Sequence, residues 1–124
     1  MGLKTGNVVQ TKASSAAYTD VAAKTLFILP PNAMPIAAKT NGTPSNALTT
    51  GVLTLYRQPV DGSSAAAAFA VVDVKTPAAG VTGNGILSGI SFNRQSKAQI
   101  ISAIYTETGT AATAGAWTIL VDFL

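Results

Sequence analysis

The clearest hydrophobic pattern in the chain lies between Ala116 and Phe123, where large apolar residues occupy every second position. These residues are Trp117, Ile119, Val121 and Phe123. Successive side chains of a β-strand point to opposite faces, so this alternation predicts a strand with one face in a core. Leu120 and Leu124 fall on the opposite face, where they would lie under a loop or meet a second subunit.

Short apolar segments separated by turn residues recur along the rest of the chain. Gly, Pro, Asn-Gly and Asp-Gly positions interrupt the sequence repeatedly, and this spacing is typical of a domain built from many short strands. The segments predicted as strands are Asn7–Thr11, Thr25–Leu29, Met34–Thr40, Gly51–Gln58, Phe69–Val74, Gly85–Phe92, Gln99–Thr106 and Ala116–Phe123.

Two alanine-containing segments are ambiguous. In "SSAAAAFAVV", Ala favours a helix that Ser63 or Ser64 would cap, whereas Val71 and Val72 favour a strand. We interpret this alanine run as a loop or a single helical turn. The segment "YTDVAAKT" is equally open between loop and regular structure.

Together these segments predict one all-β domain, an antiparallel β-sandwich with a jelly-roll-like arrangement of about eight short strands. Residues 25–124 would form the sandwich, and residues 1–24 an N-terminal arm or edge strand. The expected core residues are Phe27, Leu53, Leu55, Ile100, Ile104, Trp117, Ile119, Val121 and Phe123.

Composition adds that the domain carries little charge. Only 10% of the residues are charged, against about 25% in an average globular protein. The net charge of +3 comes from cations that are dispersed along the chain, so no clustered basic face for nucleic acid is expected. A neutral surface lacks the repulsion that keeps copies apart, which favours a homo-oligomer.

Catalytic, cofactor and metal sites are not predicted. The chain has no His and no Cys, and its five carboxylates are spread along the sequence. Ser96 and Lys97 are adjacent, which is not the spacing of a serine nucleophile with a lysine base. The glycines of "GVTGNGILSG" lack the Lys-Ser/Thr of a phosphate-binding loop. No apolar run approaches the ~18 residues of a membrane span, so no membrane partner is expected.

Two segments carry a resemblance to a known family. "KTLFILPPNAMPIAAKTNGTPSN" and "SAIYTETGTAATAGAWTILVDFL" resemble, in the same order, an apolar strand pair and a C-terminal hairpin of small tailed-phage structural proteins. The chain is similar in this respect to capsid decoration (cement) proteins, which are small β-sandwich or jelly-roll domains.

The resemblance implies a structural role without chemistry. It implies a homo-oligomer, a trimer, that binds across neighbouring copies of the phage major capsid protein and stabilises the shell. It also implies a location on the capsid surface of a virion, after synthesis in the cytoplasm of a bacterial host.

Two segments are candidates for the contact with the shell or with a neighbouring subunit: the N-terminal arm and the tip of the last hairpin. The candidate contact residues are Val8, Val9, Gln10, Thr108, Thr110, Ala111, Ala112 and Thr113. The alternatives are a plain edge strand for the arm and a tip that only faces solvent.

Other functions stay open. A head-fibre or tail component has the same β-type, and a carbohydrate-binding or adhesin-like module would use exposed aromatic residues such as Tyr18, Tyr56 and Tyr105. An enzyme is the weakest alternative because of the missing histidine.

Overall fold

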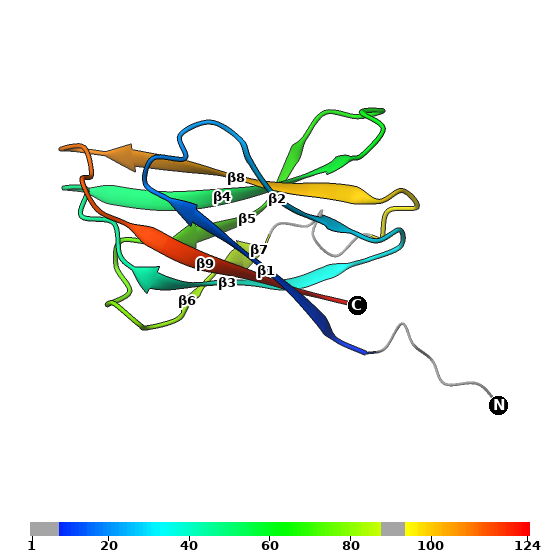
Figure 1. Ribbon diagram of the computed structural model, residues 1–124, viewed down its shortest axis with the longest axis horizontal. Helices are drawn as coiled ribbons and strands as arrows, with labels where there is room; N and C mark the ends of the chain where they lie inside the picture. Colours follow the sequence, from blue (N-terminus) through cyan, green and yellow to red (C-terminus); the bar gives the residue numbers. More distant parts are fainter. Residues whose placement is uncertain (1–7, 88–93) are drawn as a thin grey trace.

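The computed structural model describes residues 8–87 and 94–124. Nine strands, and no helix, are found in these residues, and they form two antiparallel sheets that face each other (Figure 1). The strands are β1 (Gln10–Ala17), β2 (Lys24–Leu29), β3 (Pro35–Thr43), β4 (Thr50–Pro59), β5 (Ala67–Asp73), β6 (Gly83–Asn84), β7 (Ile86–Leu87), β8 (Gln99–Thr108) and β9 (Ala116–Phe123).

The strand order confirms the predicted β-sandwich. One sheet, called sheet A, has the order β1-β9-β3-β6, and the other, called sheet B, has the order β2-β8-β4-β5-β7. The antiparallel pairs β1·β9, β2·β8, β3·β6 and β4·β5 are nested like the two arms of one long hairpin that has been rolled up. This nesting is the topology of a jelly roll.

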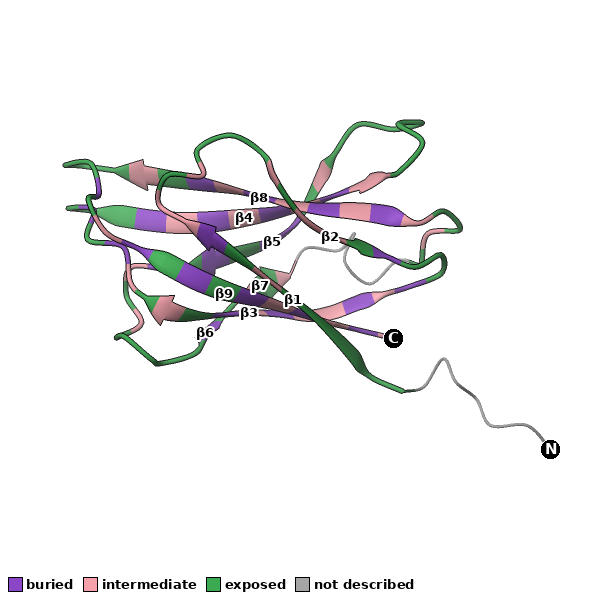
Figure 2. Ribbon diagram, in the orientation of Figure 1, coloured by how far each residue is buried: buried purple, intermediate pink, exposed green. Residues whose placement is uncertain are grey.

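The core lies between the two sheets, and burial follows a period of two along β4, β8 and β9 (Figure 2). Sheet A contributes the side chains predicted from β9, and sheet B contributes Leu53 and Leu55 from β4. Each of these leucines is completely buried, which contributes about 1.5–3 kcal/mol per side chain to folding. Phe27, also predicted for the core, packs against it from the edge strand β2.

The prediction for β8 was wrong about which face is buried. Ile101 and Tyr105 are buried, whereas Ile100 and Ile104 lie on the outer face of sheet B and are only half-buried. The register explains the choice, because Ile101 pairs with the buried Arg57 and Tyr105 pairs with the buried Leu53. Adjacent isoleucines at positions 100 and 101 gave the sequence pattern no way to choose between the faces.

Several strand boundaries also differ from the prediction, most of all in three places. β1 spans Gln10–Ala17 and not Asn7–Thr11, because β9 pairs with the small polar residues that the prediction left in a loop. In the alanine run the strand β5 begins at Ala67. The predicted strand Gly85–Phe92 is described only to position 87, where it consists of β7, and its last five residues lie outside the described ranges.

One side of the sandwich is connected by a segment that changes sheets. β6 pairs with β3 in sheet A, and two residues later β7 pairs with β5 in sheet B. Gly85 forms the corner and donates its N–H to the Ala38 carbonyl at 2.7 Å. A Cβ at this position would lie 3.1 Å from Val72 and 3.0 Å from the Ala38 oxygen, so glycine suits the narrow passage.

Candidate interaction surfaces

The tip of the last hairpin, residues 108–115, packs on the loop formed by residues 44–49. The Asn46 carboxamide oxygen accepts hydrogen bonds from the backbone N–H groups of Thr113 (2.8 Å) and Ala114 (3.1 Å). Its nitrogen donates to the Thr113 hydroxyl at 2.9 Å. The Leu48 N–H donates to the Thr110 carbonyl at 3.1 Å. The tip is therefore an ordered loop with a fixed shape.

A buried polar cluster lies directly under the tip. The Tyr105 hydroxyl donates to a carboxylate oxygen of Glu107 at 2.9 Å and also contacts the Ser45 hydroxyl. The same Glu107 oxygen accepts the Ala112 N–H at 3.0 Å, which ties the tip to β8. The Tyr105 ring stacks on Trp117 at a centroid distance of 5.4 Å. Burial raises the pKa of Tyr105, and the adjacent Glu107 carboxylate acts in the same direction.

The structure places most of the candidate contact residues of the tip at the surface. Thr108, Thr110, Ala111 and Thr113 are exposed. Ala112 is buried within the core cluster and does not present its side chain at this surface. The exposed part of the tip is thus uncharged and consists of threonine, alanine and glycine.

The N-terminal candidates lie at the opposite end of the sandwich (Figure 1). Val8, Val9 and Gln10 are all exposed. Gln10 pairs with Phe123, at the far end of β9 from the residue that follows the tip, Ala116. Seven residue steps at about 3.3 Å separate the two ends, roughly 23 Å. The two groups of candidates therefore form two separate surfaces.

The outer face of sheet A is polar and joined across three strands. Asp122 on β9 accepts a hydrogen bond from the Thr11 hydroxyl on β1 at 2.6 Å. It also forms an ion pair with Lys39 on β3 at 3.1 Å. These two contacts hold the pKa of Asp122 below its usual value, the Thr11 bond being the larger cause. Leu120, which lies on the same outer face of β9 as Asp122, is half-buried.

The outer face of sheet B mixes apolar side chains with threonine, serine and glutamine. The register places Ile28 beside Ile100 and Val71 beside Ile86, and three of these side chains are well exposed: Ile28 (49%), Val71 (42%) and Ile86 (79%). The half-buried apolar members of the face are Val52, Tyr56, Ile100 and Ile104, and Thr54, Gln58 and Ser102 lie between them. Asp73 is its one charged residue within the described strands, and its carboxylate accepts N–H bonds from Lys75 and Thr76 in the following turn.

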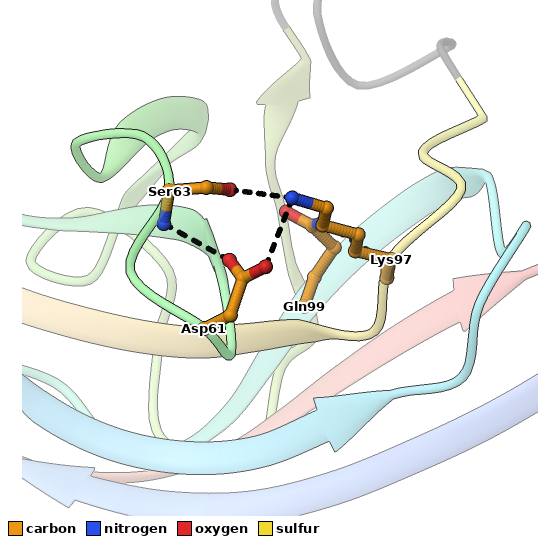
Figure 3. A network of polar contacts seen from close by, with 4 residues as sticks. All are labelled: Asp61, Ser63, Lys97 and Gln99. Carbon is orange, nitrogen blue, oxygen red and sulfur yellow. Dashed lines mark hydrogen bonds and ion pairs between the residues drawn. The ribbon is translucent and has the colours of Figure 1, made fainter.

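A group of polar contacts fixes the turn after β4 (Figure 3). Lys97 forms an ion pair with Asp61 at 2.9 Å and donates to the Ser63 hydroxyl at 3.0 Å. The Ser63 N–H donates to the other Asp61 oxygen at 2.9 Å, and Gln99 donates to the Lys97 carbonyl. The bond from Lys97 is the main cause that holds the pKa of Asp61 far below its usual value. The geometry is that of a capped turn that joins two loops.

Arg57 is a residue that sequence reasoning missed. It lies on the inner face of β4 with 2% of its surface exposed, and burial lowers its pKa. It lines a pocket of about 230 Å³ together with Gln95 and Gln99. The period of two in β4 places position 57 on the inner face, and this was the signal that the sequence offered.

The described ranges contain no group of three or more His, Cys, Asp or Glu side chains that would hold a metal ion. The same ranges contain no helix long and apolar enough to cross a bilayer. Of the three tyrosines considered for sugar binding, Tyr105 is buried, Tyr18 packs against the core, and Tyr56 is half-buried on sheet B.

Comparison with solved structures finds the same fold in chains from phage capsids. A chain in the capsid of Ralstonia phage GP4 superposes with a TM-score of 0.62 and 12% sequence identity, covering 100% of this chain and 88% of that one. A chain in the capsid asymmetric unit of cyanophage Pam1 gives a TM-score of 0.58 and 13% identity, covering 99% and 89%. No protein-family model matches the sequence, and no curated protein matches it.

Proposed function

We propose that this chain is a structural protein of a bacteriophage virion that decorates the capsid and stabilises it by binding across neighbouring major capsid proteins. The observation that carries the proposal is the fold shared along essentially the whole chain with chains from two phage capsids. The function is binding without chemistry, and its location is the outer surface of the shell.

The positions of the two candidate contact surfaces suit a bridging role. The tip of the last hairpin and the residues around Gln10 lie at opposite ends of a rigid sandwich. A protein that contacts one shell subunit with each end resists the separation of those subunits. Each contact is small, and many copies on one shell sum their binding energies.

The proposal includes a homo-oligomer, and the resemblance to capsid decoration proteins implies that it is a trimer. Ile28, Val71 and Ile86 on the outer face of sheet B support self-association, because burying such exposed large apolar side chains against a second copy is favourable. Light scattering during size exclusion measures the mass directly. Val71→Lys on this face is expected to lower the mass, and Thr118→Lys on the outer face of sheet A is the matched control.

Binding to capsids tests the central claim. Purified protein is mixed with capsids of the phage that encodes it, prepared without this protein, and occupancy is measured by co-sedimentation. We expect saturable binding and a higher temperature of capsid disruption. Wild-type protein that leaves capsids bare and no more stable would overturn the decoration function.

Variants test the two contact surfaces separately from the function. Deletion of residues 1–9 removes Val8 and Val9 and leaves β1 intact, and the pair Thr110→Asp with Ala111→Asp adds charge to the exposed tip. Both changes are expected to lower occupancy, whereas Thr118→Asp is not. Full occupancy by both variants would show that the shell contacts lie elsewhere, even though the protein binds.

A further inference from the structure

Among the described strands, β1 is the one sheet edge that is both long and regular. It is eight residues long, contains no proline, and pairs with β9 without a register shift. The other three edges are β2, which has a register shift between Thr25 and Phe27, and β6 and β7, which have two residues each. Natural sheets shorten, bulge or cover their edges, because a long regular edge pairs with other strands.

The alternation of hydrogen-bonded residues along β1 identifies which of its backbone groups point away from β9. The Tyr18 N–H donates to the Gly115 carbonyl at 3.0 Å, just beyond the end of the β1·β9 ladder. Bonds in an antiparallel ladder involve every second residue, so the even positions of β1 face β9 and the odd positions face away. Asp20 occupies the outward groups of Ala17, through its carboxylate and its N–H. The outward groups left by the described residues belong to Thr11, Ala13 and Ser15.

These three residues are self-complementary about a twofold axis. When two β1 strands run antiparallel with the axis at Ala13, Ala13 meets Ala13 of the second copy and Thr11 meets its Ser15. Each such pair exchanges two bonds, giving about six hydrogen bonds in all. The three residues are small and exposed, so no side chain blocks the approach.

The inner-facing residues of β1 fit the same register. Lys12, the strand's one charge, lies opposite Ser14 of the second copy and not opposite another lysine. Like charges directly opposite each other would destabilise the pair, and this register avoids them. Lys12 is exposed, so its ammonium group stays in solvent.

We propose that β1 pairs with β1 of a second copy, antiparallel and centred on Ala13, to form one continuous sheet across the two copies. The contact is isologous and closes with two copies. An edge contact buries much less than the roughly 800 Å² per partner of a standard interface, so it forms at high local concentration. Neighbouring oligomers on a shell meet under that condition, and the contact would join them side by side.

Cysteine pairs test the register, because the chain has no cysteine of its own. Lys12→Cys and Ser14→Cys are purified separately, concentrated to about 1 mM, a range for weak association, and oxidised alone and as a mixture. Cα atoms of a non-hydrogen-bonded pair lie about 4.5 Å apart, within disulfide range, whereas the diagonal distance between identical positions is about 7–8 Å. The mixture is expected to form several-fold more disulfide dimer than either variant alone.

Hydrogen exchange of the wild-type protein gives a second readout that needs no substitution. The amides of Thr11, Ala13 and Ser15 are expected to become protected as concentration rises, while those of Lys12 and Ser14 are protected throughout. Ala13→Pro removes one outward N–H without breaking the β9 ladder and is expected to abolish this protection at Thr11 and Ser15, whereas Ala13→Thr retains it.

Equal cross-linking in the three samples, together with outward amides that exchange freely at every concentration, would overturn the proposal. Protection of these amides only after shell protein is added would also overturn it, because the edge would then accept a strand of the shell and not a second copy.

Discussion

Replacing Tyr105 with Phe removes one oxygen atom from the cluster that anchors the hairpin tip. The hydroxyl contacts Ser45 and donates to Glu107, so both groups lose a partner. A bond to a charged group contributes about 1.5–3 kcal/mol and a neutral one about 1 kcal/mol. Glu107 is half-buried and keeps its bond from the Ala112 N–H, and Ser45 keeps its bond from the Ala47 N–H. We therefore expect a loss of about 2 kcal/mol.

Urea unfolding, followed by tryptophan fluorescence, measures this loss. A change of about 2 kcal/mol lowers the midpoint of thermal unfolding by roughly 6–10 °C in a domain of this size. Tyr56→Phe is the matched control, because the same atom is removed on the outer face of sheet B, and we expect a change within about 0.5 kcal/mol. If Tyr105→Phe also stays within that limit, the hydroxyl does not stabilise the tip and the reasoning fails.

The pH dependence of stability, compared between the wild type and Tyr105→Phe, gives an independent check. Burial raises the pKa of Tyr105 in the folded protein above its value in the unfolded chain. The folded state then holds the proton more tightly, so the stability from this group is fully present below about pH 10 and is lost as the pH rises through the folded pKa. The advantage of the wild type over Tyr105→Phe should shrink in that range and stay constant below it.

Three further predictions follow from local geometry. Asp122→Asn should cost about 1 kcal/mol at pH 7. Because the folded pKa of Asp122 is lowered, this difference should be constant above about pH 4 and be lost as the pH falls further, through the folded pKa; urea unfolding at several pH values checks it. Gly42→Ala should prevent folding, as judged by circular dichroism, because its φ is 151° and a Cβ would lie 2.1 Å from the Ala116 oxygen; Gly62→Ala, with φ 70° and open space, should cost only about 1 kcal/mol. Asn46→Ala removes three bonds to the tip and should increase proteolysis near Thr113 without lowering the thermal midpoint by more than a few degrees.

The buried face of β9 can be predicted from the sequence alone, whereas the buried face of β8 cannot. In β9 the large apolar residues are concentrated on one face, so the alternation predicts the core directly. In β8 the outer face holds Ile100 and Ile104, whereas the inner face holds Gln99, Ile101, Ala103 and Tyr105. Both faces carry large apolar residues, so hydrophobicity does not choose between them. The inner face is chosen by packing partners on other strands, such as Trp117 against Tyr105, which a local pattern does not contain.

The strand β1 has no local signal of its own. Its sequence QTKASSAA contains no large apolar residue, and Ala16 is its one buried position. β9 makes this segment a strand by offering a full ladder of backbone partners. Likewise, residues 108–113 were identified as a possible contact, but their anchoring by Asn46 and Glu107 depends on contacts between distant segments.

The order of strands along the chain has a consequence for synthesis. β9 lies between β1 and β3 in sheet A, and β8 lies between β2 and β4 in sheet B. Both of these strands are translated after the strands that they join. As the chain leaves the ribosome, β4 can pair with β5 and β3 with β6, but β1 and β2 have no partner strand until β8 and β9 have been made. Neither sheet is complete until residues 99–123 have emerged, so both sheets are completed almost together at the end of translation.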